Sequence, residues 1–427
     1  MRKLRNDPSL AAADAEGNVF PIPGLFALGR SGGTAVRVAP ADYRPLPEGA
    51  LLFRLPDRRP VGWNPRTARA EVVEEHEGRE VFAAAAFLPP AYTHLFLSPW
   101  ERVGNPSPLP LYAYAALGVA EEGFVAPAVR VDPDTRQDVG LFDEGEIRRQ
   151  AGLTRDRFPG NRLVEHLVDN CALTYCCPAA RNFVLGRWEA PIPTSPACNA
   201  DCVGCLSLQP SGEVPVTQPR LKFVPTVDEI VEMAVAHLRA APRPVVSFGQ
   251  GCEGEPLLRA ELLEEAIREI RSRTDRGTIN LNSNASRPDA IRRLVAAGLD
   301  SLRISINSCR PGLYERYYRP RGYGLDEVVA SGRAVSSAGG LVSLNYFMFP
   351  GVTDSEDEWA AFERVVEGTG ARLVQMRNLN LDPDLYLAAL GLPADLAPGF
   401  GIGRWMKRVR QRFPAVRFGY FNPAIDR

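Results

Sequence analysis

From residue 226 onward, short apolar runs alternate with longer segments whose apolar residues recur at helical spacing. Residues 226–229 have the sequence of a capping box and predict the start of a helix that Pro242 ends. A strand, a turn and another helix follow, and the cycle then repeats. The predicted strands are 188–194, 245–248, 278–284, 302–307, 341–349 and 372–380, and the helices after the first include 288–297, 325–338 and 354–367.

Six βα units within residues 186–385 predict a parallel sheet with helical crossovers. A closed barrel of this kind has eight units, so we expect an open, partial (βα)6 TIM-like barrel. Its active site should lie beyond the carboxyl ends of the strands. Residues 1–185 contain short apolar runs interrupted by Pro and Gly, with one helix near 161–170, and predict a β-rich domain suited to substrate recognition. Residues 386–427 predict a short C-terminal extension of one helix and one strand.

The composition is that of a globular protein with a real hydrophobic core, since 45% of the 427 residues are hydrophobic. The 50 basic and 51 acidic residues nearly cancel, which argues against nucleic acid as a partner. No apolar segment follows the charged start, and the longest apolar run, 81–88, is far short of the roughly 20 residues that span a bilayer. We therefore expect a cytoplasmic protein without a membrane segment.

Three cysteines follow the first predicted strand of the barrel. Cys198, Cys202 and Cys205 form a C-x3-C-x2-C run with no fourth cysteine or histidine close behind. Structural metal sites normally have four protein ligands, whereas three thiolates on one loop can hold an iron-sulfur cluster and leave one iron open. The spacing thus favours chemistry at a cluster.

This loop and four later segments resemble the radical SAM family over about residues 186–385. Gly254-Glu255-Pro256 follows the second strand and is similar to the family's Gly-Glu-Pro turn. The other matching segments lie at the ends of the third, fourth and fifth strands, around Asn284, around Ser305 and Asn307, and at Pro350-Gly351. The chain departs from the family at Gly204, where an aromatic residue is usual, and at Asn307, where an acidic residue is common.

The resemblance implies a 4Fe-4S cluster on Cys198, Cys202 and Cys205, with S-adenosylmethionine (SAM) completing its coordination. The implied SAM contacts are Glu255 and Gly254 for the amino group, Asn284, Ser305 and Asn307 for hydroxyl and carboxylate groups, and Pro350 and Gly351 near the adenine. Arg303 alternates with Ser305 on its strand and so points the same way, which makes it a candidate for the SAM carboxylate, although an ion pair is an equal alternative.

The implied reaction is reductive cleavage of SAM to a 5'-deoxyadenosyl radical that abstracts hydrogen from a small metabolite or from a peptide or protein. It needs a reductant such as flavodoxin or ferredoxin. A non-catalytic iron-sulfur or zinc protein with a structural or sensing role is the alternative, and it would have no need of Glu255 or Ser305.

Polar residues also end the last predicted strand of the barrel. Arg377, Asn378 and Asn380 stand where a buried strand would be apolar. We expect them to line the substrate or adenine pocket, and the alternative is that they cap the next turn.

The other cysteines and the histidines are expected to be structural. Cys171, Cys176 and Cys177 could hold a second cluster, but adjacent cysteines seldom ligate one metal and no fourth ligand is evident nearby. Cys252, inside the turn after the second strand, is expected to pack in the core, with a position at the mouth of the site as the alternative, and Cys309 is expected to pack. The four histidines are scattered along the sequence and are expected at surface or core positions.

Overall fold

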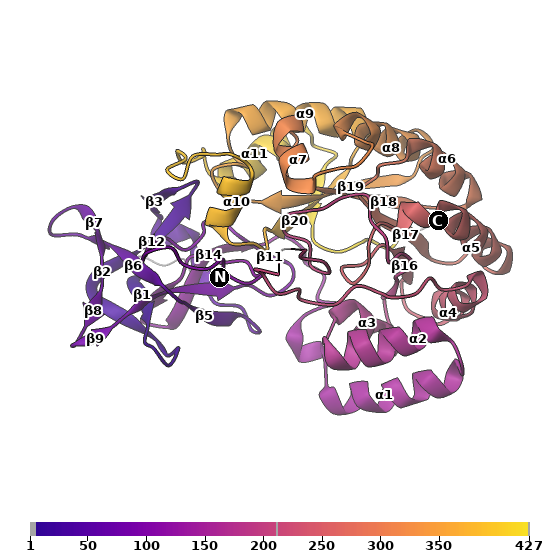
Figure 1. The fold of residues 1–427 in the computed structure, drawn as a ribbon, viewed down its shortest axis with the longest axis horizontal. Coiled ribbons are helices and arrows are strands. Elements are labelled where there is room, and N and C mark those ends of the chain that lie inside the picture. The colour runs from indigo at the N-terminus through magenta and orange to yellow at the C-terminus, as the bar shows by residue number, and fades with distance from the viewer. Residues whose placement is uncertain (1–5, 211, 426–427) are drawn as a thin grey trace.

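The computed structural model describes residues 6–210 and 212–425, which form a β-rich part and an α/β part (Figure 1). The β-rich part is a 12-stranded sheet whose strand pairs are antiparallel, with a separate two-stranded hairpin, β8–β9. Its order along the main path is β11-β14-β13-β1-β2-β6-β12. The strands are β1 (Ser9–Ala13), β2 (Val19–Ser31), β3 (Thr34–Arg37), β4 (Tyr43–Pro45), β5 (Leu51–Leu55), β6 (Arg58–Asn64), β7 (Arg69–Val72), β8 (Glu75–His76), β9 (Arg79–Glu80), β10 (Phe82–Phe87), β11 (Tyr92–His94), β12 (Trp100–Arg102), β13 (Gly118–Ala120) and β14 (Gly123–Arg130).

A layer of helices connects the two parts and packs on the α/β part. It consists of α1 (Glu144–Arg157), α2 (Arg162–Glu165), the π-helix η3 (His166–Thr174) and α3 (Pro178–Val184). Their buried apolar residues belong to the same core as those of the parallel sheet. Because of this shared core, we propose that the domain boundary lies near residue 140 and not at residue 185.

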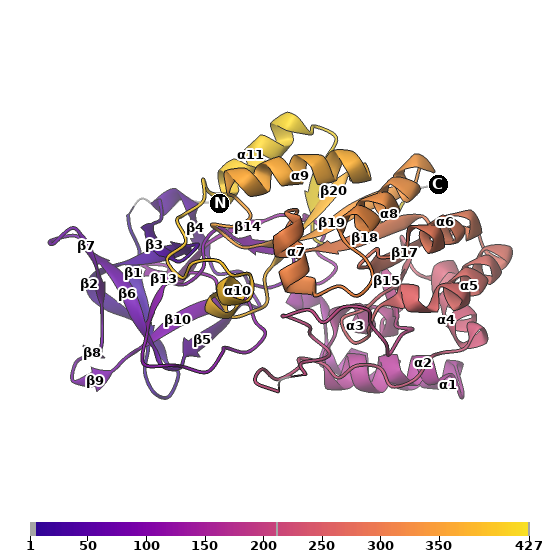
Figure 2. The same cartoon turned by 45° about the horizontal axis from the view of Figure 1, so that its top comes forward.

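The α/β part is a seven-stranded parallel sheet in the order β15 to β21, which confirms the α/β fold expected from the sequence. Helices α4, α5, α6, α8 and α9 follow the outer side of the curved sheet (Figures 1 and 2). The strands are β15 (Glu189–Ile192), β16 (Val245–Phe248), β17 (Thr278–Ser283), β18 (Ser301–Ile306), β19 (Leu341–Met348), β20 (Leu373–Asn378) and β21 (Arg417–Gly419). The helices are α4 (Val227–Ala240), η4 (Pro256–Arg259), α5 (Ala260–Arg273), α6 (Pro288–Ala297), α7 (Pro311–Tyr318), α8 (Leu325–Ser337), α9 (Glu356–Thr369), α10 (Pro383–Ala389) and α11 (Ile402–Arg412).

The seventh strand comes from the C-terminal segment, which was expected to extend beyond a six-stranded barrel. β21 pairs in parallel with β20, and α11 is the helical crossover between them. The segment completes one more βα unit because α11 buries Trp405 and Val409 against the core of the sheet. It is therefore an integral part of the barrel.

The β-rich part docks against the last strands of the barrel. The Thr93 hydroxyl on β11 donates to the Met376 carbonyl on β20 at 3.1 Å. A buried ion pair joins Arg58 to Asp382, and a partly buried one joins Arg30 to Asp384, near α10, which lies at the junction of the two parts (Figure 2). Within the described part of the chain, no helix combines the length and apolar character needed to cross a membrane.

Candidate active site

A cavity of about 610 Å³ lies where the cysteine loop, the turn after β16 and the ends of β17 to β20 meet. Its volume is in the range of typical small-molecule sites. Its location agrees with the general rule for parallel sheets, in which ligands bind beyond the carboxyl ends of the strands. Of the predicted site residues, it is lined by Cys198, Cys202, Cys205, Gly254, Glu255, Asn284, Arg303, Ser305 and Asn378.

The cysteine loop has no regular structure and is held by α7. The backbone N–H groups of Asp201 and Val203 donate to the carbonyls of Tyr318 and Tyr317, both at 3.0 Å. Ala200 forms an isolated β-bridge with Pro320 just beyond the helix. These backbone contacts fix a loop that places three half-buried thiols at one cavity.

The same loop is joined directly to the Gly-Glu turn. The Gly254 N–H donates to the Ser195 carbonyl at 2.7 Å, and the Glu255 N–H donates to the Ala197 carbonyl at 2.8 Å. A Cβ atom at position 254 would lie 2.0 Å from the Ala197 carbonyl oxygen, so only glycine permits this approach.

Glu253 fixes the start of the cysteine loop from the same turn. Its carboxylate accepts from the N–H groups of Thr194 and Ser195 at 2.7 and 2.8 Å, and from that of Gln250 at 2.8 Å. Burial raises the pKa of Glu253 to about 7, and the three N–H donors oppose this rise. The sequence analysis missed this role, although a second acidic residue in the turn was a visible signal.

Glu255 is buried at the inner end of the turn. Its carboxylate accepts hydrogen bonds from the Ser283 hydroxyl at 2.6 Å and from the backbone N–H groups of Asn284 and Leu257 at 2.9 and 3.0 Å. Burial raises the pKa of Glu255, and these donors favour its ionised form. A cationic ammonium group would be a strong partner for such a carboxylate.

The cluster cysteines have the chemistry that a metal site needs. Burial, together with the Glu255 charge, raises the pKa of Cys198 to about 11, and burial raises that of Cys202. The Arg220 guanidinium donates to Cys205 Sγ at 3.5 Å. Iron would displace the protons of these thiols, since thiolates are the ligands of iron-sulfur clusters. Three thiols on one short loop at the cavity therefore fit the implied cluster.

Two further predicted residues face the cavity from β18. Arg303 and Ser305 alternate on the strand and are partly exposed, whereas Leu302, Ile304 and Ile306 are buried on the other face. Arg303 donates only a long bond of 3.4 Å to Gln375, and its Nε atom has no partner among the residues described. Burial and the nearby Arg377 lower the pKa of Arg303 to about 9.

Arg377, Asn378 and Asn380 all line the cavity. Asn378 also binds the β-rich part, because its side chain accepts from the His94 N–H and donates to the Tyr92 carbonyl, both at 3.0 Å. Arg377 donates to the Tyr420 carbonyl at 2.7 Å and stacks on its ring.

Asn307, Pro350 and Gly351 are not brought to this cavity. The Asn307 amide donates to the Tyr386 hydroxyl at 3.2 Å and is buried beside α10. The Pro350 carbonyl accepts from the Gly32 N–H at 2.7 Å, and a Cβ atom on Gly351 would lie 2.1 Å from the same nitrogen. The Pro-Gly turn is thus occupied by the hairpin between β2 and β3, and roles for these three residues in SAM binding have no support from the geometry.

The aromatic residue expected at position 204 has a replacement from α7. A Cβ atom on Gly204 would lie 2.7 Å from the Tyr317 hydroxyl oxygen, and Tyr317 lines the same cavity. The tyrosine therefore fills the space next to the third cysteine. The pattern of the cysteine loop alone gave no sign of this.

The inner wall of the cavity is polar and includes two residues that the sequence analysis did not single out. The Asn422 amide donates to the Glu189 carboxylate at 2.7 Å, and the Ser247 hydroxyl donates to the same oxygen at 2.6 Å. Glu189 and Asn422 come from β15 and the C-terminal segment. No local pattern signals a contact between residues so far apart in the sequence.

Comparison with protein families identifies the class. Residues 192–362 match the model of the Radical SAM superfamily, so this part of the chain is a radical SAM domain and the chain is classed as an enzyme of unidentified substrate. No curated protein matches the sequence.

Solved structures of radical SAM enzymes are similar at low identity. Methylornithine synthase PylB has a TM-score of 0.38 and 14% identity over 67% of this chain and 74% of its own. SuiB of Streptococcus suis, solved with the precursor peptide SuiA, has a TM-score of 0.39 and 13% identity over 57% and 53%. The hydrogenase maturase HydG has a TM-score of 0.34 and 13% identity over 66% and 67%. These values are too low to carry a conclusion about substrate.

Proposed function

We propose that this chain cleaves SAM reductively at a 4Fe-4S cluster held by Cys198, Cys202 and Cys205. The bound cluster would supply an electron that splits SAM into methionine and a 5'-deoxyadenosyl radical, which abstracts hydrogen from the substrate. One observation carries the proposal. The cysteine loop and the Glu255 turn are joined through Gly254, so that three thiols and a buried carboxylate share one cavity.

The protein groups around the cavity can bind SAM through its polar atoms. Glu255 would accept the ammonium group, since three donors hold its carboxylate in place. Arg303 would bind the SAM carboxylate, because it lines the cavity, its bond to Gln375 is long at 3.4 Å, and its Nε atom has no partner among the described residues. Ser305 and Asn284 supply hydrogen-bonding groups on the same wall.

A second guanidinium indicates the chemistry of the substrate. Arg377 lies on the same cavity wall, and burial together with the Arg377 charge lowers the pKa of Arg303. The nearby Glu189 is already bonded to Ser247 and Asn422. With Arg303 bound to the SAM carboxylate, Arg377, whose Nε atom has no partner among the described residues, would be left to bind a carboxylate or phosphate on the substrate. We infer a small molecule or peptide that carries such an anionic group.

The proposal includes an external electron donor such as flavodoxin or ferredoxin, and a cytoplasmic location where such donors occur. The near balance of basic and acidic residues gives no reason to propose nucleic acid as the substrate.

The test is anaerobic reconstitution with iron and sulfide, reduction with dithionite, and measurement of 5'-deoxyadenosine and methionine after SAM is added. We expect both products from the wild-type protein and from Cys176→Ala, an exposed cysteine outside the cavity lining, but not from Cys202→Ala. A fully loaded cluster that yields neither product would overturn the proposal and favour a non-catalytic iron-sulfur protein.

A further inference from the structure

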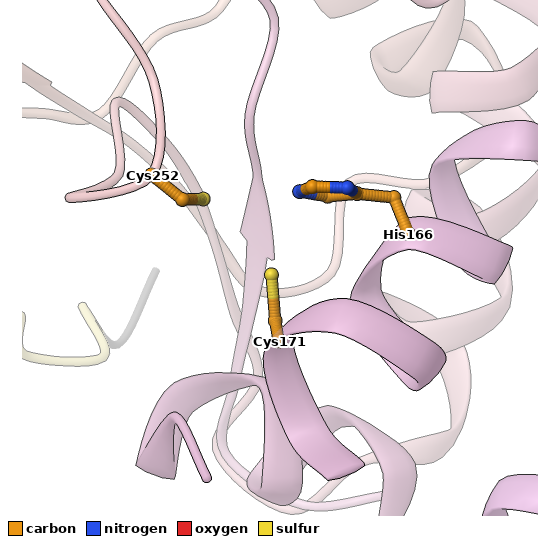
Figure 3. Close-up of side chains that lie close together, drawn as sticks. All are labelled: His166, Cys171 and Cys252. Carbon is orange, nitrogen blue, oxygen red and sulfur yellow. The ribbon is translucent and has the colours of Figure 1, made fainter. Parts of the chain in front are cut away.

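A second group of metal-binding side chains lies apart from the three cluster cysteines. His166 and Cys171 on η3 and Cys252 on the turn after β16 each offer one ligand atom, and these atoms all lie within 4.8 Å of one another. Figure 3 shows the two sulfur atoms and the imidazole ring pointing toward a common space. The sequence analysis favoured structural roles for these residues, so their convergence requires an explanation.

The π-helix creates half of this arrangement. His166 and Cys171 are five positions apart, and in an ordinary α-helix that separation would rotate them by about 140° around the axis. The i→i+5 hydrogen bonds of η3 widen the turn and bring the two side chains to one side (Figure 3). π-helical turns occur frequently at functional sites.

One of the three side chains also has a nitrogen atom that is free to bind a metal. His166 Nε2 is buried and has no hydrogen-bond partner in the part of the chain that is described. Cys171 and Cys252 are only 2% and 4% exposed. The Gln218 amide donates to Cys171 Sγ at 3.2 Å, as amide groups commonly do to metal-bound thiolates.

We propose that His166, Cys171 and Cys252 bind a single Zn²⁺ ion. In tetrahedral zinc sites with Zn–S of about 2.3 Å and Zn–N of about 2.0 Å, the ligand atoms lie roughly 3.5–3.8 Å apart, so only a small contraction is needed. Two thiolates balance the charge of the ion, and an imidazole with two thiolates is a ligand set typical of zinc. A water molecule or the Gln218 side chain would complete the coordination.

Such an ion would tie η3 to the turn that carries Glu255. Cys252 is three positions before Glu255, and its carbonyl accepts from the Leu221 N–H at 2.7 Å. The zinc ion would thereby stabilise one wall of the cavity from outside it. This role does not depend on the proposed reaction, because the metal content is measured without turnover.

The experiment is metal analysis of the protein purified with Zn²⁺ in the medium, without iron reconstitution. We expect about one zinc per chain in the wild type and in the Cys198→Ser/Cys202→Ser/Cys205→Ser variant. Cys171→Ser and Cys252→Ser should each lose most of it, whereas Cys176→Ser, in the same segment as Cys171 but exposed, should retain it. Zinc X-ray absorption of the wild type should show two sulfur ligands at about 2.3 Å and one nitrogen at about 2.0 Å.

The X-ray absorption spectrum of the wild-type protein reports the zinc ligands directly, so it tests the proposal even if a variant does not fold. Four results would each overturn the proposal. The zinc content could be far below one per chain, or the zinc could be bound only through the cluster cysteines. The purified protein could contain a Cys171–Cys252 disulfide, or the triple variant could contain iron and sulfide. Replacement by Co²⁺ with a thiolate-to-cobalt absorption that Cys252→Ser abolishes would support it.

Discussion

The guanidinium of Arg58 lies 2.7 Å from the carboxylate of Asp382, and both side chains are only 2% exposed. This pair links β6 of the β-rich part to the start of α10 in the barrel. Asp382 also accepts from the Leu109 N–H at 2.9 Å and caps α10. The two parts of the molecule are therefore joined by a buried charge pair and not by apolar contacts alone.

Arg58→Met should destabilise the protein by roughly 3–5 kcal/mol, because it leaves the Asp382 carboxylate buried without a counter-charge. Urea unfolding of the apo-protein measures this effect. The double variant Arg58→Met/Asp382→Asn should recover part of the loss, because it removes the buried charge and asparagine can still cap α10, while its amide nitrogen cannot accept from the Leu109 N–H. Equal stability of the single and double variants would contradict the assigned role of the pair.

Gly254→Ala should prevent stable cluster binding. Its Cβ atom would collide with the Ala197 carbonyl oxygen and separate the turn from the cysteine loop. Gly251→Ala is the matched control, because a Cβ atom there would meet only Leu206 Cδ1 at 3.6 Å. Iron and sulfide content after reconstitution should fall several-fold in the first variant and stay unchanged in the second.

Glu255→Gln should weaken SAM binding at least tenfold, a loss of about 1.4 kcal/mol or more, because it removes the charge opposite the ammonium group. The measurement is equilibrium binding of SAM to the reconstituted, unreduced protein. Glu261→Gln, which removes a charge from the exposed side of α5, should leave the affinity unchanged. Unaltered SAM affinity in Glu255→Gln would refute the assigned contact.

Gly204→Ala should reduce cluster content and thermal stability, because its methyl group would lie 2.7 Å from the Tyr317 hydroxyl oxygen. The double variant Gly204→Ala/Tyr317→Phe should restore both, since the next Tyr317 atom is 3.6 Å away. Non-additive effects in this double-mutant cycle would show that the two positions share one space. Additive effects would count against the replacement of the loop aromatic by Tyr317.

Two buried histidines should make the fold sensitive to acid. Burial lowers the pKa of His94 and of His237 to about 4, below the value near 6.5 of an unfolded histidine. The unfolded chain therefore binds protons first as the pH falls, and stability is lost between about pH 6.5 and 4.

Between about pH 6.5 and 4, the free energy of unfolding of His94→Gln should fall by roughly 1–3 kcal/mol less than that of the wild type. Urea unfolding at several pH values measures the difference, and comparison with the wild type removes the contribution of carboxylates. His76→Gln, on the β8–β9 hairpin, is the control and should leave the slope unchanged. Parallel profiles for wild type and His94→Gln would contradict the prediction.

The sequence predicted those parts of the site that lie at the ends of strands, because strands are recognised by the regular alternation of apolar and polar residues. Strand ends such as those of β18 and β20 could be located because apolar periodicity fixes the strands and parallel pairing places their ends together. Contacts such as Gly351 with Gly32 depend instead on how two separate parts dock. No local pattern encodes that docking, so the Pro350-Gly351 turn was assigned to the cofactor.

The pairing of β21 with the barrel sheet and the His166–Cys171 pair were missed for related reasons. The three-residue strand β21 joins the barrel sheet by pairing with β20. The local sequence around β21 does not reveal which strand it pairs with. The π-helix changes the spacing at which residues share a face, so a search at α-helical intervals separates two residues that the structure unites.

The Asn422 side chain, which bonds to Glu189 from 233 positions away, has a consequence for assembly. The first strand of the barrel leaves the ribosome well before its C-terminal partner, so the inner wall of the cavity cannot close during most of translation. An iron-sulfur cluster inserted early would meet an unfinished cavity open to water and oxidants. Cluster loading should therefore follow synthesis of this last segment.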